Sequence, residues 1–231
     1  MLTDLQAAHP AAVPSPSTTD SVAATAAGLE LGSRRRGFAA SLGFALDGLL
    51  GAADRGRNMK IQLVCGLLVA LVGSGLAMGL VERLALLACV GAVLSAEAFN
   101  TAIEAAVDLA TATFHEKARI AKDAAAGAVL VLSVSSTLVL LAILLDQAPT
   151  FAAQAWRIGL QLAAGGPLAL CASLLLRRAE RRRAVDYALS GTGALLLALL
   201  AAWTASVPFT VLAAVLFGAC VAVALRRRSV G

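Results

Sequence analysis

Charged and aromatic residues are scarce in this sequence. Of its 231 residues only 14% are charged and 4% are aromatic, whereas 59% are hydrophobic. A soluble globular domain contains about 25% charged residues, so this deficit excludes an ordinary water-soluble enzyme. Together with a mean hydropathy of +0.84, the composition predicts an integral membrane protein.

Paired cysteines are missing as well. Cys65, Cys89, Cys171 and Cys220 each lie alone in an apolar run, with no C-x-x-C spacing and no neighbouring histidine. This distribution excludes a disulfide scaffold and a zinc site. It favours buried thiols that pack as small apolar side chains.

A phosphate-binding loop of the G-x-x-x-x-G-K-[ST] type is also absent. Gly73, Gly75 and Gly79 resemble such a loop only superficially, because they lie in an apolar segment. Small residues in such a segment indicate close packing between helices.

Six apolar segments approach the length of about 20 residues that a membrane-spanning helix needs. They are residues 61–80, 84–104, 124–145, 158–176, 185–206 and 208–225. An even number of spans places both termini on one side of the membrane. Residues 38–54 before them predict an amphipathic helix in the membrane interface, with Asp47 and Asp54 opposite its apolar arc.

The basic residues are distributed very unevenly over the predicted topology. All but two of the 19, Arg83 and Arg157, lie on the side of the N-terminus. The positive-inside rule therefore predicts that both termini are cytoplasmic. The rule also explains the net charge of +5 without nucleic-acid binding. Residues 1–33, rich in Ala, Ser and Thr, predict a disordered cytoplasmic tail.

Acidic side chains in the second apolar segment point to function. Glu97, Asn100, Glu104 and Asp108 share one face of a helix. Glu97 lies about 10 Å deeper than Glu104 at the helical rise. A carboxylate within a span costs about 2.5–3.5 kcal/mol on insertion scales, and these acids repel one another unless a cation or a proton joins them. A polar seam between helices is the structural alternative, for which Asn100 alone would suffice.

The hydrophilic segment that follows carries His115, Lys122 and Asp123. Carboxylates and a lysine at a cytoplasmic edge suit a nucleoside triphosphate with Mg²⁺, because magnesium prefers one or two carboxylates together with phosphate oxygens. Lysine and the metal would stabilise the charge of a phosphoryl group during transfer.

The run E-A-F-N-T-A-I-E at residues 97–104, followed by Asp108, His115, Lys122 and Asp123, resembles the signature of the bacterial membrane diacylglycerol and undecaprenol kinases. The segment before the first span adds to this likeness. Phe44, Gly48 and the run R-N-M-K-I, which contains Asn58, are similar to the approach to the first span in that family.

The resemblance, which covers about residues 44–145, implies a surface helix and three transmembrane helices, usually assembled as a homotrimer with shared active sites. It implies transfer of the γ-phosphate of ATP to the hydroxyl of diacylglycerol or undecaprenol in a bacterial inner or plasma membrane. The R-N-M-K-I run slightly favours undecaprenol.

The resemblance also implies residue roles. Glu97 would be the general base and would contact the lipid substrate together with Asn100. Glu104 would bind Mg²⁺ and nucleotide, and the other nucleotide-binding residues would be Asn100, Asp108, Lys122 and Asp123. Roles for Gly48, Asn58 and His115 would be structural.

Two positions depart from the family pattern. Gly56 stands where the family usually has a metal-binding glutamate, and Gln62 replaces a histidine. Asp54 could take the place of that glutamate only if the backbone turns at Gly56. One alternative is therefore a catalytically impaired scaffold descended from the kinase. Another is an ion-coupled transporter, which would need acids along a path through several spans.

The sequence therefore predicts an all-α integral membrane protein with an interfacial helix, a three-helix kinase core and three further transmembrane helices. The kinase domain would occupy residues 34–145, and residues 146–231 would form an additional region of unknown role that resembles no part of the family. The basic cluster at residues 177–183 is a topology anchor or, alternatively, a site for anionic lipid headgroups.

Overall fold

A computed structural model describes residues 37–111, 113–177 and 183–227. The predicted tail at residues 1–33 and most of the basic cluster at 177–183 lie outside the described residues. Residues 45–231 form one compact unit. Of residues 1–44, the other unit, the structure describes only Gly37 and the beginning of the first labelled helix.

The described residues form seven α-helices and no strand. The helices are α2 (Phe38–Arg55), α3 (Arg57–Gly75), α4 (Leu80–Ala110), α5 (Glu116–Gln147), α6 (Phe151–Leu176), α7 (Arg183–Ala202) and α8 (Val207–Arg226), with a 3-10 turn η1 (Ala148–Thr150) before α6. Six of them, α3 to α8, are long and apolar enough to cross a membrane. The predicted all-α integral membrane fold with six spans is thereby confirmed.

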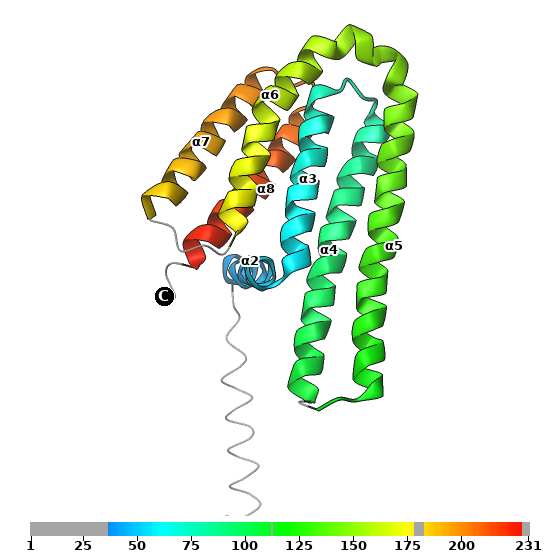
Figure 1. Ribbon diagram of the computed structural model, residues 1–231, viewed down its shortest axis with the longest axis vertical. Helices are drawn as coiled ribbons and strands as arrows, with labels where there is room; N and C mark the ends of the chain where they lie inside the picture. The colour runs from blue at the N-terminus through cyan, green and yellow to red at the C-terminus, as the bar shows by residue number, and fades with distance from the viewer. Residues whose placement is uncertain (1–36, 112, 178–182, 228–231) are drawn as a thin grey trace, which may run out of the picture. The chain divides into compact units, whose positions relative to one another are not determined.

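The predicted boundaries of the first three spans differ from the observed helices. The first span ends at Gly75 instead of residue 80, because its glycines are poor helix formers. Helices α4 and α5 have 31 and 32 residues, about 46–48 Å at the helical rise, whereas the hydrocarbon core is about 30 Å thick. Their joined ends extend beyond α3 as a hairpin (Figure 1). Hydropathy alone missed these ends, because Glu104 and Asp108 in α4 and the polar first two turns of α5 interrupt the apolar pattern without ending the helix.

Helix α3 is the centre of the transmembrane packing. It packs against α4 on one side and against α6 and α8 on the other, while α5 pairs with α4 and α7 pairs with α6. One continuous apolar core joins both halves of the chain and includes Leu67, Ala70, Leu168, Ala172, Phe209 and Cys220. Helices α6 and α8 are therefore packed onto the first span.

Glycine allows two close contacts of α3, as predicted for Gly73 and Gly75. The same prediction was wrong for Gly79, which is the N-cap of α4 and lies against Glu82 of that helix. A Cβ atom on Gly73 would lie 2.7 Å from the ring of Phe209 in α8. On Gly75 it would lie 2.8 Å from Cγ of Gln161 in α6. Any larger side chain at either position would push α8 or α6 away from α3.

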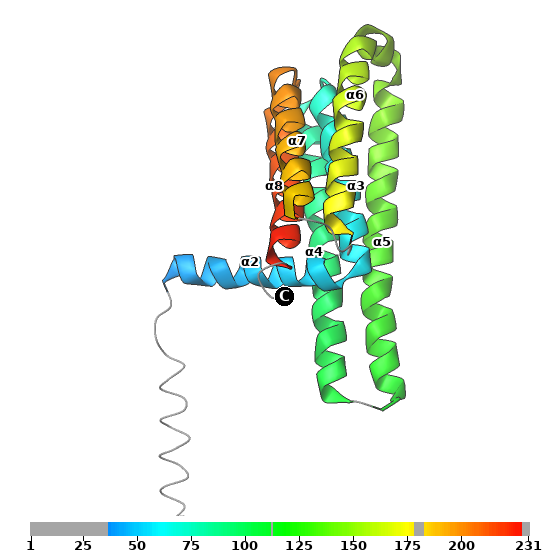
Figure 2. The same cartoon turned by 60° about the vertical axis from the view of Figure 1, so that its left-hand side comes forward.

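The end of α8 is tied to α2. From residue 45 onward, α2 lies across the ends of α3 and α8 (Figure 2). Arg227 forms an ion pair with Asp54 and donates a hydrogen bond of 3.1 Å to the carbonyl of Leu176 at the end of α6. Arg226 donates to the carboxylate of Asp47 at 3.1 Å. The C-terminal helices thus hold the helix that precedes the first span.

Candidate functional site

One unbroken helix, α4, carries the polar side chains that were predicted to share a helix face. We call these four residues, Glu97, Asn100, Glu104 and Asp108, the stripe. Glu97 and Asn100 are 2% and 3% exposed, whereas Glu104 and Asp108 are exposed. Asn100 donates a hydrogen bond of 2.9 Å from Nδ2 to Oε1 of Glu104. Along the stripe, the buried carboxylate of Glu97 is therefore followed by the amide of Asn100 and then by the exposed carboxylate of Glu104.

The buried end of the stripe lies on the same face of α4 as Thr101, which faces the junction between α2 and α3. Thr101 donates a hydrogen bond of 3.0 Å to the carbonyl of Glu97. Its hydroxyl lies 3.6 Å from where a Cβ atom on Gly56 would be. Because residues four apart share a helix face, Glu97 is turned toward this junction too.

Two buried oxygen atoms at this end have no hydrogen-bond partner among the described residues. They are Oε2 of Glu97 and Oδ1 of Asn100. Leaving buried polar atoms unpaired is costly. A proton, a cation or a ligand hydroxyl would satisfy them. These two oxygens are therefore the part of this helix face that the described residues leave unsatisfied.

The exposed end of the stripe is joined to α5. Lys122 Nζ lies 2.5 Å from Oδ1 of Asp108, which places a cation from α5 at the end of the α4 stripe. His115 precedes α5, and its Nδ1 accepts a hydrogen bond of 3.2 Å from the backbone N–H of Lys117. In this way His115 caps the helix that positions Lys122.

Three other predicted residues lie apart from these contacts. Asp123 pairs with Arg119 at 2.9 Å on an exposed face of α5. Asn58 is exposed in the first turn of α3. Gly48 is exposed in α2 with open space around it. The structure brings together Glu97, Asn100 and Glu104, and joins Asp108 to Lys122.

In the described part of the chain, no three His, Cys, Asp or Glu side chains are grouped closely enough to hold a metal ion. The backbone does turn at Gly56, which has extended dihedral angles (φ −73°, ψ 121°) between α2 and α3. Asp54, the candidate substitute for the family's glutamate, is however paired with Arg227. The arrangement fits a metal held by Glu104 together with phosphate oxygens.

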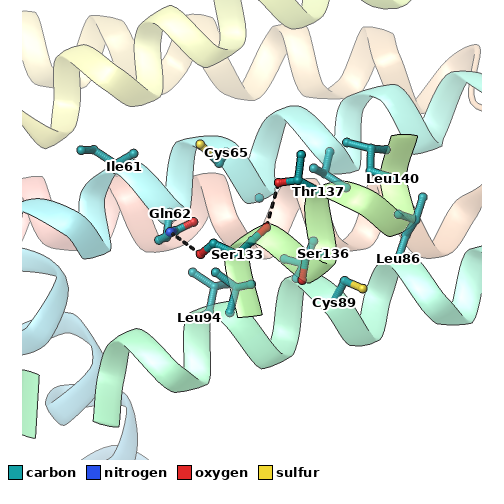
Figure 3. A pocket seen from close by; sticks show the side chains of 14 residues that line it. Ile61, Gln62, Cys65, Leu86, Cys89, Leu94, Ser133, Ser136, Thr137 and Leu140 are labelled. Carbon is teal, nitrogen blue, oxygen red and sulfur yellow. Dashed lines mark hydrogen bonds between the residues drawn. The ribbon is translucent and has the colours of Figure 1, made fainter. Parts of the chain in front are cut away.

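A groove of about 250 Å³ lies between α3, α4 and α5 (Figure 3). Val93 and Leu94, which line it, are one helical turn from Glu97. Gln62, at the position of the family's histidine, donates a hydrogen bond of 3.1 Å to Ser133 across the groove. The remaining lining is mostly apolar. The groove is therefore a mostly apolar recess that begins one helical turn from Glu97.

Two cysteines also line this groove, which corrects one prediction. Cys171 and Cys220 are buried as predicted, but Cys65 is exposed and Cys89 is half-buried. All four, which the structure describes, are free thiols. An apolar side chain on a membrane-spanning helix can face a groove or the bilayer as readily as the protein core.

Comparison with known proteins identifies the family. The profile of the prokaryotic diacylglycerol kinases matches residues 43–144. The chain is 36% identical over 100 residues to undecaprenol kinase of Bacillus subtilis, an alignment that covers 43% of this chain and 81% of that enzyme. The chain belongs to the prokaryotic diacylglycerol kinase family. A diacylglycerol kinase of Synechocystis is 38% identical over 102 residues, which cover 43% of this chain and 57% of that protein. No solved structure matches.

Family membership makes this chain a membrane lipid kinase by descent and suggests a divalent metal with ATP. It does not favour the impaired scaffold or the transporter. The match ends before α6, so the three C-terminal helices of this diacylglycerol kinase family member lie outside the family profile.

Sequence reasoning missed the partners that surround the stripe. Thr101 lies within the motif but was given no role, although it faces Gly56. Arg226 and Arg227 were counted only as topology signals, although they bind Asp47 and Asp54. The sequence contains no local signal for contacts between residues 173 or 179 positions apart.

Proposed function

We propose that the protein transfers the γ-phosphoryl group of Mg-ATP to the hydroxyl of a membrane lipid alcohol, undecaprenol or diacylglycerol, at the cytoplasmic interface. The observation that carries this proposal is the graded stripe on α4. The buried carboxylate of Glu97 has an unpartnered oxygen, and Asn100, one turn along α4, donates a hydrogen bond to the exposed carboxylate of Glu104. Such a pair can contact an apolar alcohol at one end and a hydrophilic nucleotide at the other.

Glu97 is the general base of the proposed reaction. Its unpartnered Oε2 accepts the proton of the lipid hydroxyl, and the resulting oxygen nucleophile attacks the γ-phosphorus. The bond between the γ-phosphorus and the bridging oxygen of ADP then breaks, and ADP leaves with its negative charge. Asn100 orients the hydroxyl, since its own Oδ1 is buried and unpartnered among the described residues.

Glu104 and Lys122 act on the nucleotide side. Magnesium bound there by Glu104 and phosphate oxygens would supply electrostatic stabilisation of the transferring phosphoryl group. Asn100 fixes the rotamer of Glu104 through their hydrogen bond. Asp108 holds Lys122 at the end of the stripe, ready to exchange that carboxylate for a phosphate oxygen. Asp123 contributes to nucleotide binding from the next position on α5.

The acceptor lipid places its chain in the groove between α3, α4 and α5. The lining is mostly apolar and begins one turn from Glu97, so a chain there brings its terminal hydroxyl to the base. Undecaprenol is the preferred acceptor, because the relative that aligns over 81% of its length is an undecaprenol kinase.

The functional unit is a homo-oligomer, a trimer by resemblance to the family, in a bacterial inner or plasma membrane with both termini cytoplasmic. The large exposed apolar surface of α5 supports a partner there: Leu130, Val131, Val134, Leu138 and Leu141 are all at least half exposed. Within each chain, residues 34–145 supply the chemistry and residues 146–231 support it.

The proposal is tested by incubating the purified full chain with labelled ATP, Mg²⁺ and either undecaprenol or diacylglycerol in mixed micelles. We expect phosphorylated lipid, with a higher kcat/KM for undecaprenol. The undecaprenol kinase of Bacillus subtilis is the positive control for the assay. No product with either lipid, where that control is active, would reject the proposed activity.

A further inference from the structure

The groove between α3, α4 and α5 is built as a floor with two walls. Helix α4 packs against both α3 and α5, so α4 is the floor and the other two helices are the walls. Side chains of all three helices line the groove. Along α4 the lining extends from Leu86 to Leu94, about 12 Å at the helical rise. The floor therefore leads along α4 toward Glu97, one turn beyond Leu94.

A hydrogen bond joins the two walls near this end of the groove. Gln62 of α3 donates it from Nε2 to Oγ of Ser133 in α5, at 3.1 Å (Figure 3). A hydroxyl both donates and accepts, so the two side chains can bond in either orientation of the amide. Both side chains are half-buried in a mostly apolar lining, where a broken hydrogen bond is costly. We call this pair the bridge.

Two close contacts fix the depth of the bridge relative to Glu97. Helices α3 and α4 follow each other in the chain and run side by side in opposite directions (Figure 1). Gly56 of α3 lies beside Thr101 of α4, and Gly66 lies against Val90. Interpolation between these contacts places the bridge one helical turn, about 5 Å, from the level of Glu97. A lipid whose hydroxyl is at Glu97 therefore meets the bridge within its first few carbon atoms.

We propose that the bridge selects the acceptor lipid, so that Gln62 and Ser133 are specificity-determining residues of the kinase reaction. This selection rests on the proposed function, in which the lipid chain lies in this groove. A volume of about 250 Å³ spread over this length of α4 is the cross-section of a single hydrocarbon chain.

The two candidate acceptors differ at the level of the bridge. Undecaprenol has a single chain, which carries no polar atom besides its hydroxyl and leaves the hydrogen bond between Gln62 and Ser133 intact. In diacylglycerol both acyl chains begin within two carbon atoms of the one that carries the hydroxyl. Both chains therefore reach the bridge, which must open to admit them, and the lost hydrogen bond weakens the binding of diacylglycerol.

Lipid binding in the absence of ATP tests the bridge separately from the chemistry. An undecaprenol analogue with a diazirine in the isoprene unit next to the hydroxyl would be photo-crosslinked to the purified full chain in mixed micelles. Unlabelled undecaprenol and dioleoylglycerol would serve as competitors, and mass spectrometry would locate the crosslinked peptides. We expect crosslinks in the groove-lining segments of α3, α4 and α5. We also expect undecaprenol to compete at a lower mole fraction than dioleoylglycerol.

Removing the bridge should reduce this discrimination. Gln62→Ala should lower the affinity ratio of undecaprenol to dioleoylglycerol by about two- to tenfold, the equivalent of one hydrogen bond, through tighter binding of dioleoylglycerol. Ser133→Ala and the double variant should give the same ratio, because each of them removes the whole bond. Ser133→Thr keeps the hydroxyl and should keep the wild-type ratio. Ser135→Ala, at an exposed position of α5 outside the lining, is the matched control.

An unchanged ratio in Gln62→Ala, with folding verified by circular dichroism and a single gel-filtration peak, would overturn the proposal. Weaker binding of dioleoylglycerol by Gln62→Ala would overturn it too, because the amide would then be holding an ester carbonyl. Crosslinks outside the groove, or equal competition by the two lipids in the wild-type chain, would overturn it without any variant. Selective binding without lipid phosphorylation would support the bridge and reject the kinase activity, so the two failures are distinguishable.

Discussion

The α4–α5 hairpin and the three C-terminal helices use membrane-spanning helices in opposite ways. In α4 and α5, 28% and 6% of the most apolar stretch is buried, compared with 39% in α6, 17% in α7 and 39% in α8. The hairpin carries the acidic stripe, whereas the described parts of α6, α7 and α8 contain one acid, Asp186. The difference teaches that α5 leaves most of its apolar surface exposed, whereas α6 and α8 bury the side of α3 that α4 does not cover.

Helix α3 connects the two regions. Half of its apolar stretch is buried, with α4 on one side and α6 and α8 on the other. The ion pair between Arg227 and Asp54 extends this link to α2, next to Gly56 and the buried end of the stripe. The C-terminal helices α6 and α8 are thus linked, through α3 and α2, to the surroundings of the buried end of the stripe.

The largest expected effect is that of Glu97→Gln. Loss of a general base lowers the rate by about 10²–10⁴-fold, so lipid phosphorylation should fall by this factor while the Kd for ATP stays unchanged. Initial rates and equilibrium nucleotide binding measure the two quantities. Glu82→Gln, at the opposite end of α4, is the control and should alter neither. Equal loss of ATP binding in Glu97→Gln and Glu104→Gln would mean that the two roles are misassigned.

Glu104→Gln should produce the next largest effect, on the nucleotide side. Loss of a group that only orients a metal ligand lowers metal affinity by about 10–100-fold, so loss of the ligand itself should raise the Mg²⁺ concentration for half-maximal rate by at least such a factor. A magnesium titration of the phosphorylation rate measures it. An unchanged magnesium requirement would place the metal elsewhere.

Arg227→Ala tests whether the C-terminal helices support α2. The side chains of Arg227 and Asp54 are only 17% and 29% exposed, so losing the pair should lower the free energy of unfolding by about 1–3 kcal/mol. Arg226→Ala is the matched control, because its pair with Asp47 is more exposed and is worth about 0–1 kcal/mol. Thermal unfolding in detergent compares the two. An equal loss of stability in the two variants would show that the pair of Arg227 and Asp54 stabilises the protein no more than the exposed pair does.

Gly56→Glu should have the smallest effect. The backbone at Gly56 suits any residue, and its Cβ would need only a slight shift from the carbonyl of Ala52, 3.0 Å away. If Glu104 and the phosphates already hold the metal, restoring the family's glutamate should change the rate little. Gly56→Gln controls for the added bulk. A large gain specific to glutamate would instead indicate an impaired site.

The sequence was sufficient for the features that depend on local geometry. Six apolar segments predicted the six spans, and helical periodicity predicted that Glu97, Asn100 and Glu104 share a face, because both depend only on residues within one helix. The family motif supplied their roles, which remain predictions. The apolar pattern could not show that α4 and α5 continue as polar helices beyond the spans.

Contacts between segments far apart in the chain could not be predicted from the sequence. Nothing near Gln161 indicates that Ser74, 87 positions away, contacts its amide. The partners of Arg226 and Arg227 depend on where α8 ends relative to α2. The pair of Asp123 with Arg119 was not predicted either, and the nucleotide-binding role of Asp123 stays a prediction.

The central claim is that Glu97 activates a lipid hydroxyl for attack on ATP, and paired labelling of ATP tests it most directly. Purified wild-type chain and Glu97→Gln would be incubated with undecaprenol, Mg²⁺ and ATP labelled at either the α- or the γ-phosphate. The account predicts labelled lipid only from γ-labelled ATP and only with the wild-type chain. Equal lipid labelling by Glu97→Gln, or incorporation of the α-label, would contradict it.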